Sequence, residues 1–263
     1  MSDLLVRTAV GALLAIGITI VAELRHALTR SGVIAATALG TVCAAAGWDW
    51  AGLLVAFFLT GTLLSRFGEK RKNANTGGMA EKGGARDASQ VIANGGVYGV
   101  LALASILTGE SLLIVPAIGA IAASTSDTWA TEVGTLYSNS ARSILTLRPV
   151  QAGTSGGITF TGTMAGVAGA VFITILTVAL GFPASAAAAA LAGGIGGSLI
   201  DSILGATLQS RRWCVPCGRE TERTIHTCGV MTEHRGGMKW LDNDGVNLLG
   251  SVSGAALGAL CLL

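Results

Sequence analysis

Three aspartates lie within or beside long apolar segments of the chain: Asp127, Asp201 and Asp244. A carboxylate at membrane depth is unfavourable unless it is paired, hydrated or bound to a cation, so such residues are candidates for function. Mg²⁺ usually takes one or two protein carboxylates and completes its shell with water and substrate phosphates. Acids drawn from different segments are what such a site requires, so the three aspartates are candidates for metal and phosphate chemistry.

A fourth acid, Glu132, follows Asp127 by five residues. On a regular helix the two carboxylates would stand about 140° apart, because each residue advances by about 100°. They can serve one site only if the helix is broken or if each faces a different partner. The alternative is that Glu132 is simply a residue at the cytoplasmic end of its segment.

Asp201 continues a stripe of small residues at helical spacing, formed by Gly194, Gly197 and Gly205. Small residues let membrane helices approach closely. We expect these glycines to serve helix packing and Asp201 to lie in the same seam, facing protein or water.

Cations and amides that suit an anionic ligand recur in the segment before Gly95. Lys82, Arg86, Gln90 and Asn94 are spaced by four residues, so a helix would carry them on one face. For Lys82 the alternative is a basic side chain that snorkels to the membrane edge. Asn94 is the stronger candidate, because a buried amide needs partners.

Two further groups of polar residues precede apolar segments. Asn243 and Asn247 are one helical turn apart beside Asp244, whereas Asp242 is explained equally well as a helix cap. The run 148–157 is rich in Gly, Ser and Thr, and backbone N–H groups at a helix N-terminus bind phosphate well, helped by an arginine. The candidates in this run are Arg148, Thr154, Gly156 and Gly157. Neither a GxxxxGK[ST] loop nor a GxGxxG unit after a strand occurs, which excludes a P-loop or Rossmann nucleotide site.

Cysteine usage points to a metal in the last polar loop. Cys214, Cys217 and Cys228 lie there with His226 and His234. The spacing resembles a zinc knuckle, and a reducing compartment argues against a disulfide. We expect a structural Zn²⁺ bound by the three cysteines and His226, with His234 as the alternative fourth ligand.

Composition indicates which elements must position these residues. Of the 263 residues 51% are hydrophobic and only 12% are charged, against about 25% in soluble domains. This excludes an ordinary water-soluble enzyme and a disordered chain, and the net charge of +2 disfavours nucleic acid as a partner. The 38 glycines show no fixed period, so a fibre is excluded as well.

A membrane crossing needs about 20 mostly apolar helical residues, and about eight such stretches occur, with seven or nine as the alternatives. We predict an all-α, polytopic membrane helix bundle that forms a single membrane domain over residues 1–263. The stretches cover 4–21, 33–46, 51–64, 88–107, 112–136, 158–180, 184–209 and 242–262.

Basic residues give the expected orientation. Apart from Arg7, every Lys and Arg falls in alternate connections, and positive charge gathers on the cytoplasmic side. We therefore expect both termini outside, polar cytoplasmic loops at 66–87 and 210–241, and a site facing the cytoplasm of a prokaryotic plasma membrane. The first apolar stretch lacks a basic leader and a small-residue cleavage site, so it is expected to stay as a helix.

Four runs resemble an integral-membrane family catalogued as a domain of unknown function, to which the phytyl-phosphate kinases of plants and cyanobacteria belong. The runs are 86–96, 126–134, 197–209 and 240–247. The resemblance implies transfer of the γ-phosphate of CTP or another nucleoside triphosphate to a prenyl monophosphate, with Mg²⁺.

Under that resemblance the candidates acquire roles. The acids Asp127, Asp201 and Asp244, helped by Glu132, would hold Mg²⁺. Lys82, Arg86 and Arg148 would clamp phosphates, and Asn94, Gln209, Asn243 and Asn247 would orient them. The alternative is a secondary transporter of a phosphorylated or anionic solute, which would use similar acids and glycine-interrupted helices. Such a transporter needs a polar path to both sides of the membrane, whereas the candidate site residues gather near the cytoplasmic side only. The sequence leaves the oligomeric state open.

Overall fold

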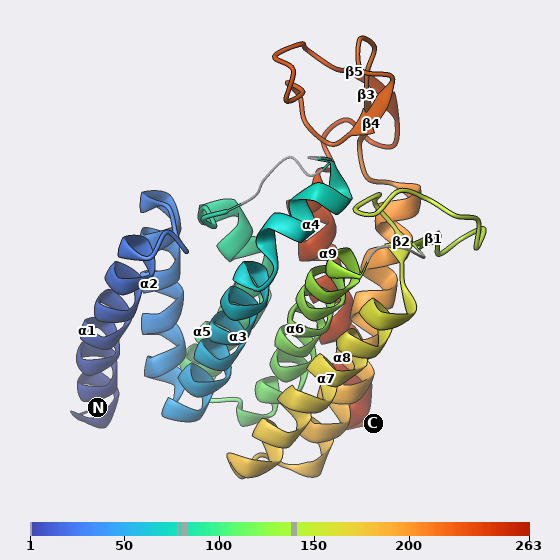
Figure 1. The fold of residues 1–263 in the computed structure, drawn as a ribbon. Coiled ribbons are helices and arrows are strands. Elements are labelled where there is room, and N and C mark those ends of the chain that lie inside the picture. The colour runs from blue at the N-terminus through green and yellow to red at the C-terminus, as the bar shows by residue number, and fades with distance from the viewer. Residues whose placement is uncertain (1, 78, 80–83, 138–140) are drawn as a thin grey trace.

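The computed structural model describes residues 2–77, 79, 84–137 and 141–263 as a mostly helical bundle (Figure 1), which confirms the predicted fold class. Eight long helices occupy the eight predicted apolar stretches. They are α1 (Ser2–Leu24), α2 (Arg30–Ala46), α3 (Trp48–Arg66), α5 (Ala88–Thr108), α6 (Ile114–Leu136), α7 (Phe160–Ala179), α8 (Ala184–Thr207) and α9 (Asn243–Ala259). Short 3₁₀ turns precede α6 (Ser111–Leu113) and follow α9 (Leu260–Leu262).

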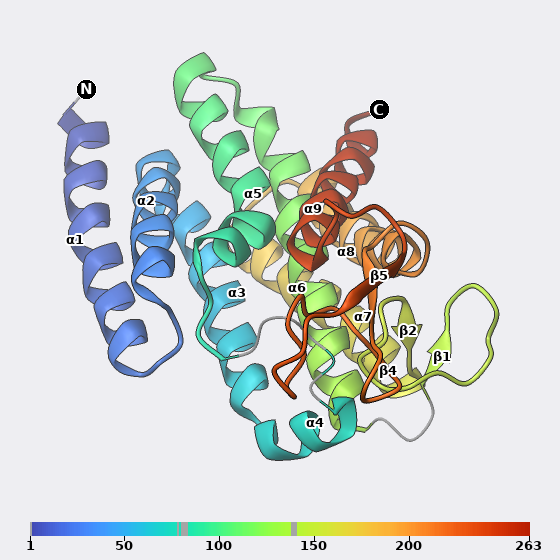
Figure 2. The same ribbon diagram turned by 90° about the horizontal axis from the view of Figure 1, so that it is seen from above.

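Helix α6 forms the centre of the bundle, with α5, α7, α8 and α9 packed against it (Figure 2). Every residue from Ile114 to Ser126 is buried. Its apolar side chains form the main core together with Leu53 and Phe57 of α3 and Ile173 of α7. The central helix therefore holds its polar half, which begins at Ser124, in a fixed place.

Glycines bring α6, α8 and α9 into close contact. A Cβ at Gly193 of α8 would lie 2.7 Å from the Cα of Gly119 on α6 and 2.6 Å from the carbonyl oxygen of Gly254 on α9. A Cβ at Gly197 would lie 2.5 Å from the Cβ of Ala123. Small residues let helices approach in this way. Of the predicted stripe, Gly197 packs here and Gly194 packs against Ala170 of α7, whereas Gly205 approaches Gly156 in the loop before α7.

Helices α1 and α2 stand at the edge of the bundle (Figures 1 and 2). Thr19 and Thr37 share a hydrogen bond of 2.9 Å between them, while Leu5 and Leu13 of α1 are exposed. By length and composition seven helices of the described chain could cross a membrane, and α2, with 17 residues, is shorter than these.

Both termini lie at one end of the bundle, and the connections at the other end carry several small elements (Figure 1). These are α4 (Glu69–Thr76), β1 (Arg142–Ser143), β2 (Gly157–Ile158), β3 (Arg211–Cys214), β4 (Arg219–Thr221) and β5 (Glu233–Gly236). Strands β1 and β2 pair antiparallel, and the second sheet has the order β4-β3-β5. The two long segments that were predicted only as polar loops contain regular elements: 66–87 contains a helix, and 210–241 contains a three-stranded sheet.

Candidate functional site

A cavity of about 1320 Å³ opens at the end of the bundle that carries the sheets. It lies between the ends of α3, α6 and α8, the starts of α5, α7 and α9, and the segment after β4. Thirteen of the candidate site residues line this single cavity. They are Arg86, Gln90, Asn94, Asp127, Glu132, Thr154, Gly156, Gly157, Asp201, Gln209, Asn243, Asp244 and Asn247.

Asp127 of α6 and Asp201 of α8 meet in the deep part of the site. Both residues line the same small recess, and their carboxyl groups interact electrostatically. A Cβ at Gly250 of α9 would lie 2.9 Å from Asp201 Oδ2, so glycine makes room for this carboxyl. Oδ2 is buried and has no hydrogen-bond partner in the described part of the chain, nor has the nearby Ser251 Oγ. Two carboxyls this close need a shared proton or a cation between them.

Glu132 lines the same cavity but has other partners. Helix α6 is continuous, so Glu132 lies about 7.5 Å along the axis from Asp127 and on a different face. Its carboxylate accepts hydrogen bonds of 2.5 Å from Ser65 Oγ and from Lys72 Nζ. The helix is not broken to bring the two acids of α6 together.

Lys72 of α4 is a cavity residue that the sequence did not single out. Besides its ion pair with Glu132, its Nζ donates to the carbonyl oxygens of Leu64 and Ser65, both at 2.7 Å. A cation at the C-terminal carbonyls of a helix is favourable. The only available signal was its position in a basic run, which does not reveal that the side chain is buried.

Arg86 reaches the cavity from an extended segment and not from a helix. Helix α5 begins after Asp87, which caps it, so Arg86 does not share a helical face with Gln90 and Asn94 as predicted. Its backbone N–H donates to Ala27 O at 2.9 Å, which anchors the segment. Burial lowers the pKa of the guanidinium, and the charge of Glu132 opposes that shift.

Two predicted cations are not placed in the cavity. Arg148 is exposed in the loop between β1 and β2 and is absent from the lining, so the geometry gives no support to its role as a phosphate clamp. Lys82 lies outside the described residues. Arg223, which follows β4, lines the cavity although the sequence did not suggest it.

The N-termini of three helices converge on the cavity. Asp87 caps α5 in a capping box with Gln90, Thr159 caps α7, and Asp242 caps α9. Thr154, Gly156 and Gly157 lie just before α7, as expected for a phosphate loop. Because helix N-termini favour anions, this end of the bundle suits a ligand with several phosphates.

Polar side chains at the starts of α5 and α9 form hydrogen bonds within α5 and between the two helices. The Gln90 side chain accepts from the backbone N–H of Asp87 at 3.2 Å, and Asn94 Nδ2 donates to Gln90 O at 3.0 Å. Ser89 Oγ donates to Asp244 Oδ2 at 2.8 Å, which connects α5 to α9. These contacts fix the side chains before any ligand binds.

Glu222 is a third cavity residue that the sequence did not suggest. It follows β4, and its Oε1 accepts from Ser155 Oγ at 2.6 Å and from Gln209 Nε2 at 2.7 Å. Gln209, a predicted phosphate ligand, is therefore connected through Glu222 to the end of strand β4 in the three-stranded sheet. The nearby thiols Cys214, Cys217 and Cys228 gather with His226 on that sheet, outside the cavity lining.

Comparisons with known proteins identify the family of the chain. The chain matches the family described as Integral membrane protein DUF92 over residues 13–255. It is 34% identical over 252 residues to Protein PGR of Arabidopsis thaliana, covering 86% of this chain and 85% of that protein. An uncharacterized membrane protein of Methanocaldococcus jannaschii is 31% identical over 259 residues, covering 98% and 95%.

Protein VTE6, chloroplastic, of Arabidopsis thaliana is 29% identical over 242 residues, covering 89% of this chain and 65% of that protein. No solved structure matches. The family resemblance seen in the four sequence runs is confirmed, and the chain is a multi-pass integral membrane protein that belongs to the DUF92 family.

Proposed function

We propose that this protein is a prenyl-phosphate kinase, which transfers the γ-phosphate of CTP or another nucleoside triphosphate to an isoprenoid monophosphate and yields the diphosphate. The observation that carries the proposal is the single cavity that joins the Asp127–Asp201 pair to three helix N-termini. The family resemblance supplies the reaction type. One relative is chloroplastic, so the family does not share a single membrane location. The location of this protein in a prokaryotic plasma membrane is part of the proposal.

Positioning and neutralisation of charge account for most of phosphoryl-transfer catalysis. The acceptor phosphate is already ionised, so it needs little help from a general base. Arg86 and the N–H groups at the starts of α5, α7 and α9 would bind phosphate oxygens, and Thr154 to Gly157 would orient the donor.

The acids fit the Mg²⁺ that such a kinase requires. Asp201 Oδ2 is buried beside Asp127 and has no hydrogen-bond partner in the described ranges of the chain, and Asp244 borders the same cavity. Within the described residues Asp244 does not join the other two in a compact three-ligand cluster. Mg²⁺ usually takes only one or two protein carboxylates. Asp127 and Asp201 would therefore bind the ion, and Asp244 would lie near the substrate phosphates. When bound, the ion would neutralise charge on the transferring phosphate.

One side of the cavity is apolar and could receive the prenyl chain. Val167 of α7 and Ile195 and Leu199 of α8 line it there. Leu199 is also 44% exposed on the outside of the bundle, where lipid would lie. A substrate could therefore place its phosphate among the polar residues while its tail stays in the bilayer.

The transporter alternative needs a polar path to the opposite end of the bundle. Residues Ile114 to Ala123 of α6 are all buried in that half, mostly among apolar neighbours. This packing favours an enzyme over a transporter.

The test uses the purified protein with farnesyl or phytyl monophosphate, labelled CTP and Mg²⁺. We expect labelled prenyl diphosphate, and Asp201→Asn should abolish turnover while the helical signal is unchanged. Asp49→Asn, at the start of α3 and outside the cavity, is the matched control and should retain activity. Activity retained by Asp201→Asn would reject that residue as a metal ligand. No product with any nucleoside triphosphate, combined with solute uptake into vesicles, would favour the transporter.

A further inference from the structure

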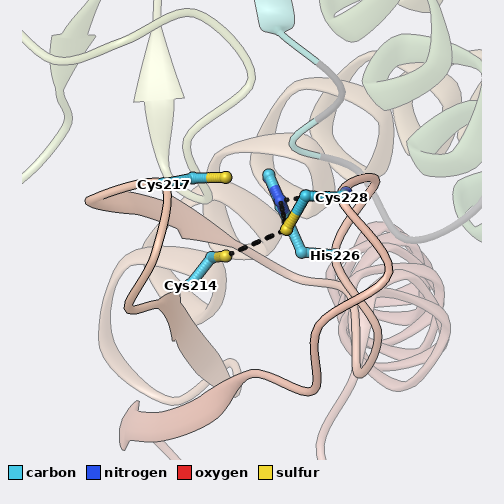
Figure 3. Close-up of side chains that lie close together, drawn as sticks. All are labelled: Cys214, Cys217, His226 and Cys228. Carbon is cyan, nitrogen blue, oxygen red and sulfur yellow. Dashed lines mark hydrogen bonds between the residues drawn. The ribbon is translucent and has the colours of Figure 1, made fainter.

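Four side chains with metal-binding atoms meet at the tip of the three-stranded sheet (Figure 3). They are Cys214, Cys217, His226 and Cys228, and their ligand atoms all lie within 4.8 Å of one another. The sulfurs of Cys214 and Cys228 are 3.6 Å apart, and His226 Nδ1 is 3.2 Å from Cys228 Sγ. His234, the alternative ligand, is not part of this cluster.

These distances suit a tetrahedral metal site. With a Zn–S bond of about 2.3 Å, two thiolates on one zinc are about 3.8 Å apart. A disulfide would need sulfurs about 2.0 Å apart, and all these cysteines are free. Sulfur and nitrogen ligands in a tetrahedral set are typical of zinc.

The backbone forms two turns that present the ligands. In the first, the N–H of Gly218 donates to Cys214 O at 2.9 Å, and in the second the N–H of Gly229 donates to His226 O at 2.8 Å. Gly218 has φ +61° and Gly229 has φ +82°, values that favour glycine. Each ligand pair is thus followed by a glycine that lets the chain turn back around a common point.

The sheet has almost no hydrophobic core of its own. Across 210–240, a range that the structure describes throughout, the buried side chains are Cys214, Thr221, His226 and Thr232. Cys214 is the only apolar one among them. A unit of this size with so little apolar burial usually needs a disulfide or a metal to fold.

The same sheet is attached to the cavity. Thr221 Oγ1 and the N–H of Glu222 donate to Met79 O, at 3.2 and 3.0 Å. Glu222 in turn accepts from Ser155 and Gln209. The position of Glu222 in the cavity therefore depends on the sheet being folded.

We propose that Cys214, Cys217, His226 and Cys228 bind one structural Zn²⁺, which holds the three-stranded sheet in place over the cavity and keeps Glu222 against Ser155 and Gln209. This site is separate from the proposed magnesium site and does not depend on the kinase reaction.

Elemental analysis of the purified full-length protein tests the site. We expect about one zinc per chain, lost on replacement of Cys214 or Cys228 by serine. Cys261→Ser is the matched control, because Cys261 lies after α9 and outside the cluster, and it should keep the zinc. Co²⁺ exchanged into the site should give the visible absorption of tetrahedral thiolate coordination, which the Cys214→Ser variant lacks.

Limited trypsin digestion tests the consequence for the sheet. Removal of zinc by a chelator should expose Arg219 and Arg223 to cleavage, while the helical circular dichroism of the bundle stays unchanged. Zinc-free protein with a Cys214–Cys228 disulfide, or zinc retained by the serine variants, would overturn the proposal. Unchanged trypsin resistance after zinc removal would reject the structural role of the ion.

Discussion

Two partly buried acids that line the cavity, Glu132 and Asp201, differ in their surroundings. Glu132 accepts from Lys72 and Ser65, so its charge is balanced inside the protein. Asp201 has a buried oxygen that finds no hydrogen-bond partner among the described residues, and a second carboxyl group lies beside it. The first arrangement is typical of a structural ion pair, and the second is typical of a residue that awaits a cation or a proton.

Replacing Lys72 by methionine should lower stability without removing a phosphate ligand. The change leaves Glu132 without its cation, and breaking a fully buried pair costs about 3–5 kcal/mol. Because the Glu132 side chain is 22% exposed, we expect a smaller loss of about 1–3 kcal/mol. Thermal unfolding in detergent should show a lower midpoint.

Lys70→Met is the control for this prediction, since Lys70 is exposed on the same short helix and should leave the midpoint nearly unchanged. The double variant Lys72→Met, Glu132→Gln should recover part of the loss. Equal midpoints for Lys72→Met and Lys70→Met would show that the pair contributes nothing to stability.

At the scale of elements, apolar length and the spacing of charges predicted the eight long helices. Their ends agree within a few residues, as for 184–209 against α8 and 88–107 against α5. The strands could not be predicted, because they are two to four residues long and lack alternating hydrophobicity. Helix α4 could not be predicted either, since every residue but Ala74 is polar and the helix is held by the contacts of Lys72.

Most residues of the candidate site could be predicted from the sequence, but their arrangement in space could not. Residue types indicated that Asp127 and Asp201 have a function, yet their pairing depends on how α6 and α8 are rotated. That rotation is fixed by contacts such as Gly193 with Gly119, which no pattern in one segment reveals. For the same reason the sequence favoured Arg148, whose loop points away, over Arg223, which the sheet brings to the cavity.

The glycine seam yields a prediction for Gly193→Ala. Alanine is better than glycine in a helix by about 1 kcal/mol, but here its Cβ would meet backbone atoms of α6 and α9 at 2.6–2.7 Å. Backbone cannot yield as a side chain can, so we expect a net loss of about 1–3 kcal/mol and lower activity through displacement of Asp201. Thermal unfolding and the kinase assay measure the two effects.

Gly52→Ala on α3 is the matched control, because no described atom outside its own helix backbone and its two chain neighbours lies within 4 Å of its Cβ position. This variant should be as stable as the parent or slightly more stable. If Gly193→Ala behaved in the same way, the close packing of α6, α8 and α9 would be disproved.

At the scale of the whole molecule, chemistry is concentrated at one end. The sheets lie there, opposite the two termini (Figure 1). The residues that line the cavity belong to the same end. The connections at this end also carry every described Lys and Arg except Arg7. From the positive-inside rule we therefore expect the cavity to face the cytoplasm. The kinase proposal requires the same orientation, because nucleoside triphosphates are available on that side.

Cysteine labelling in intact bacterial cells tests this orientation. Thr146→Cys lies in the exposed loop between β1 and β2, and Ala184→Cys lies at the opposite end, at the exposed start of α8. A membrane-impermeant maleimide should label Ala184→Cys in intact cells and Thr146→Cys only after the cells are broken, with peptide mapping to separate these sites from native thiols. The reverse pattern would place the cavity outside the cell, away from its phosphate donor, and would contradict the kinase even if the fold and the acid pair were unchanged.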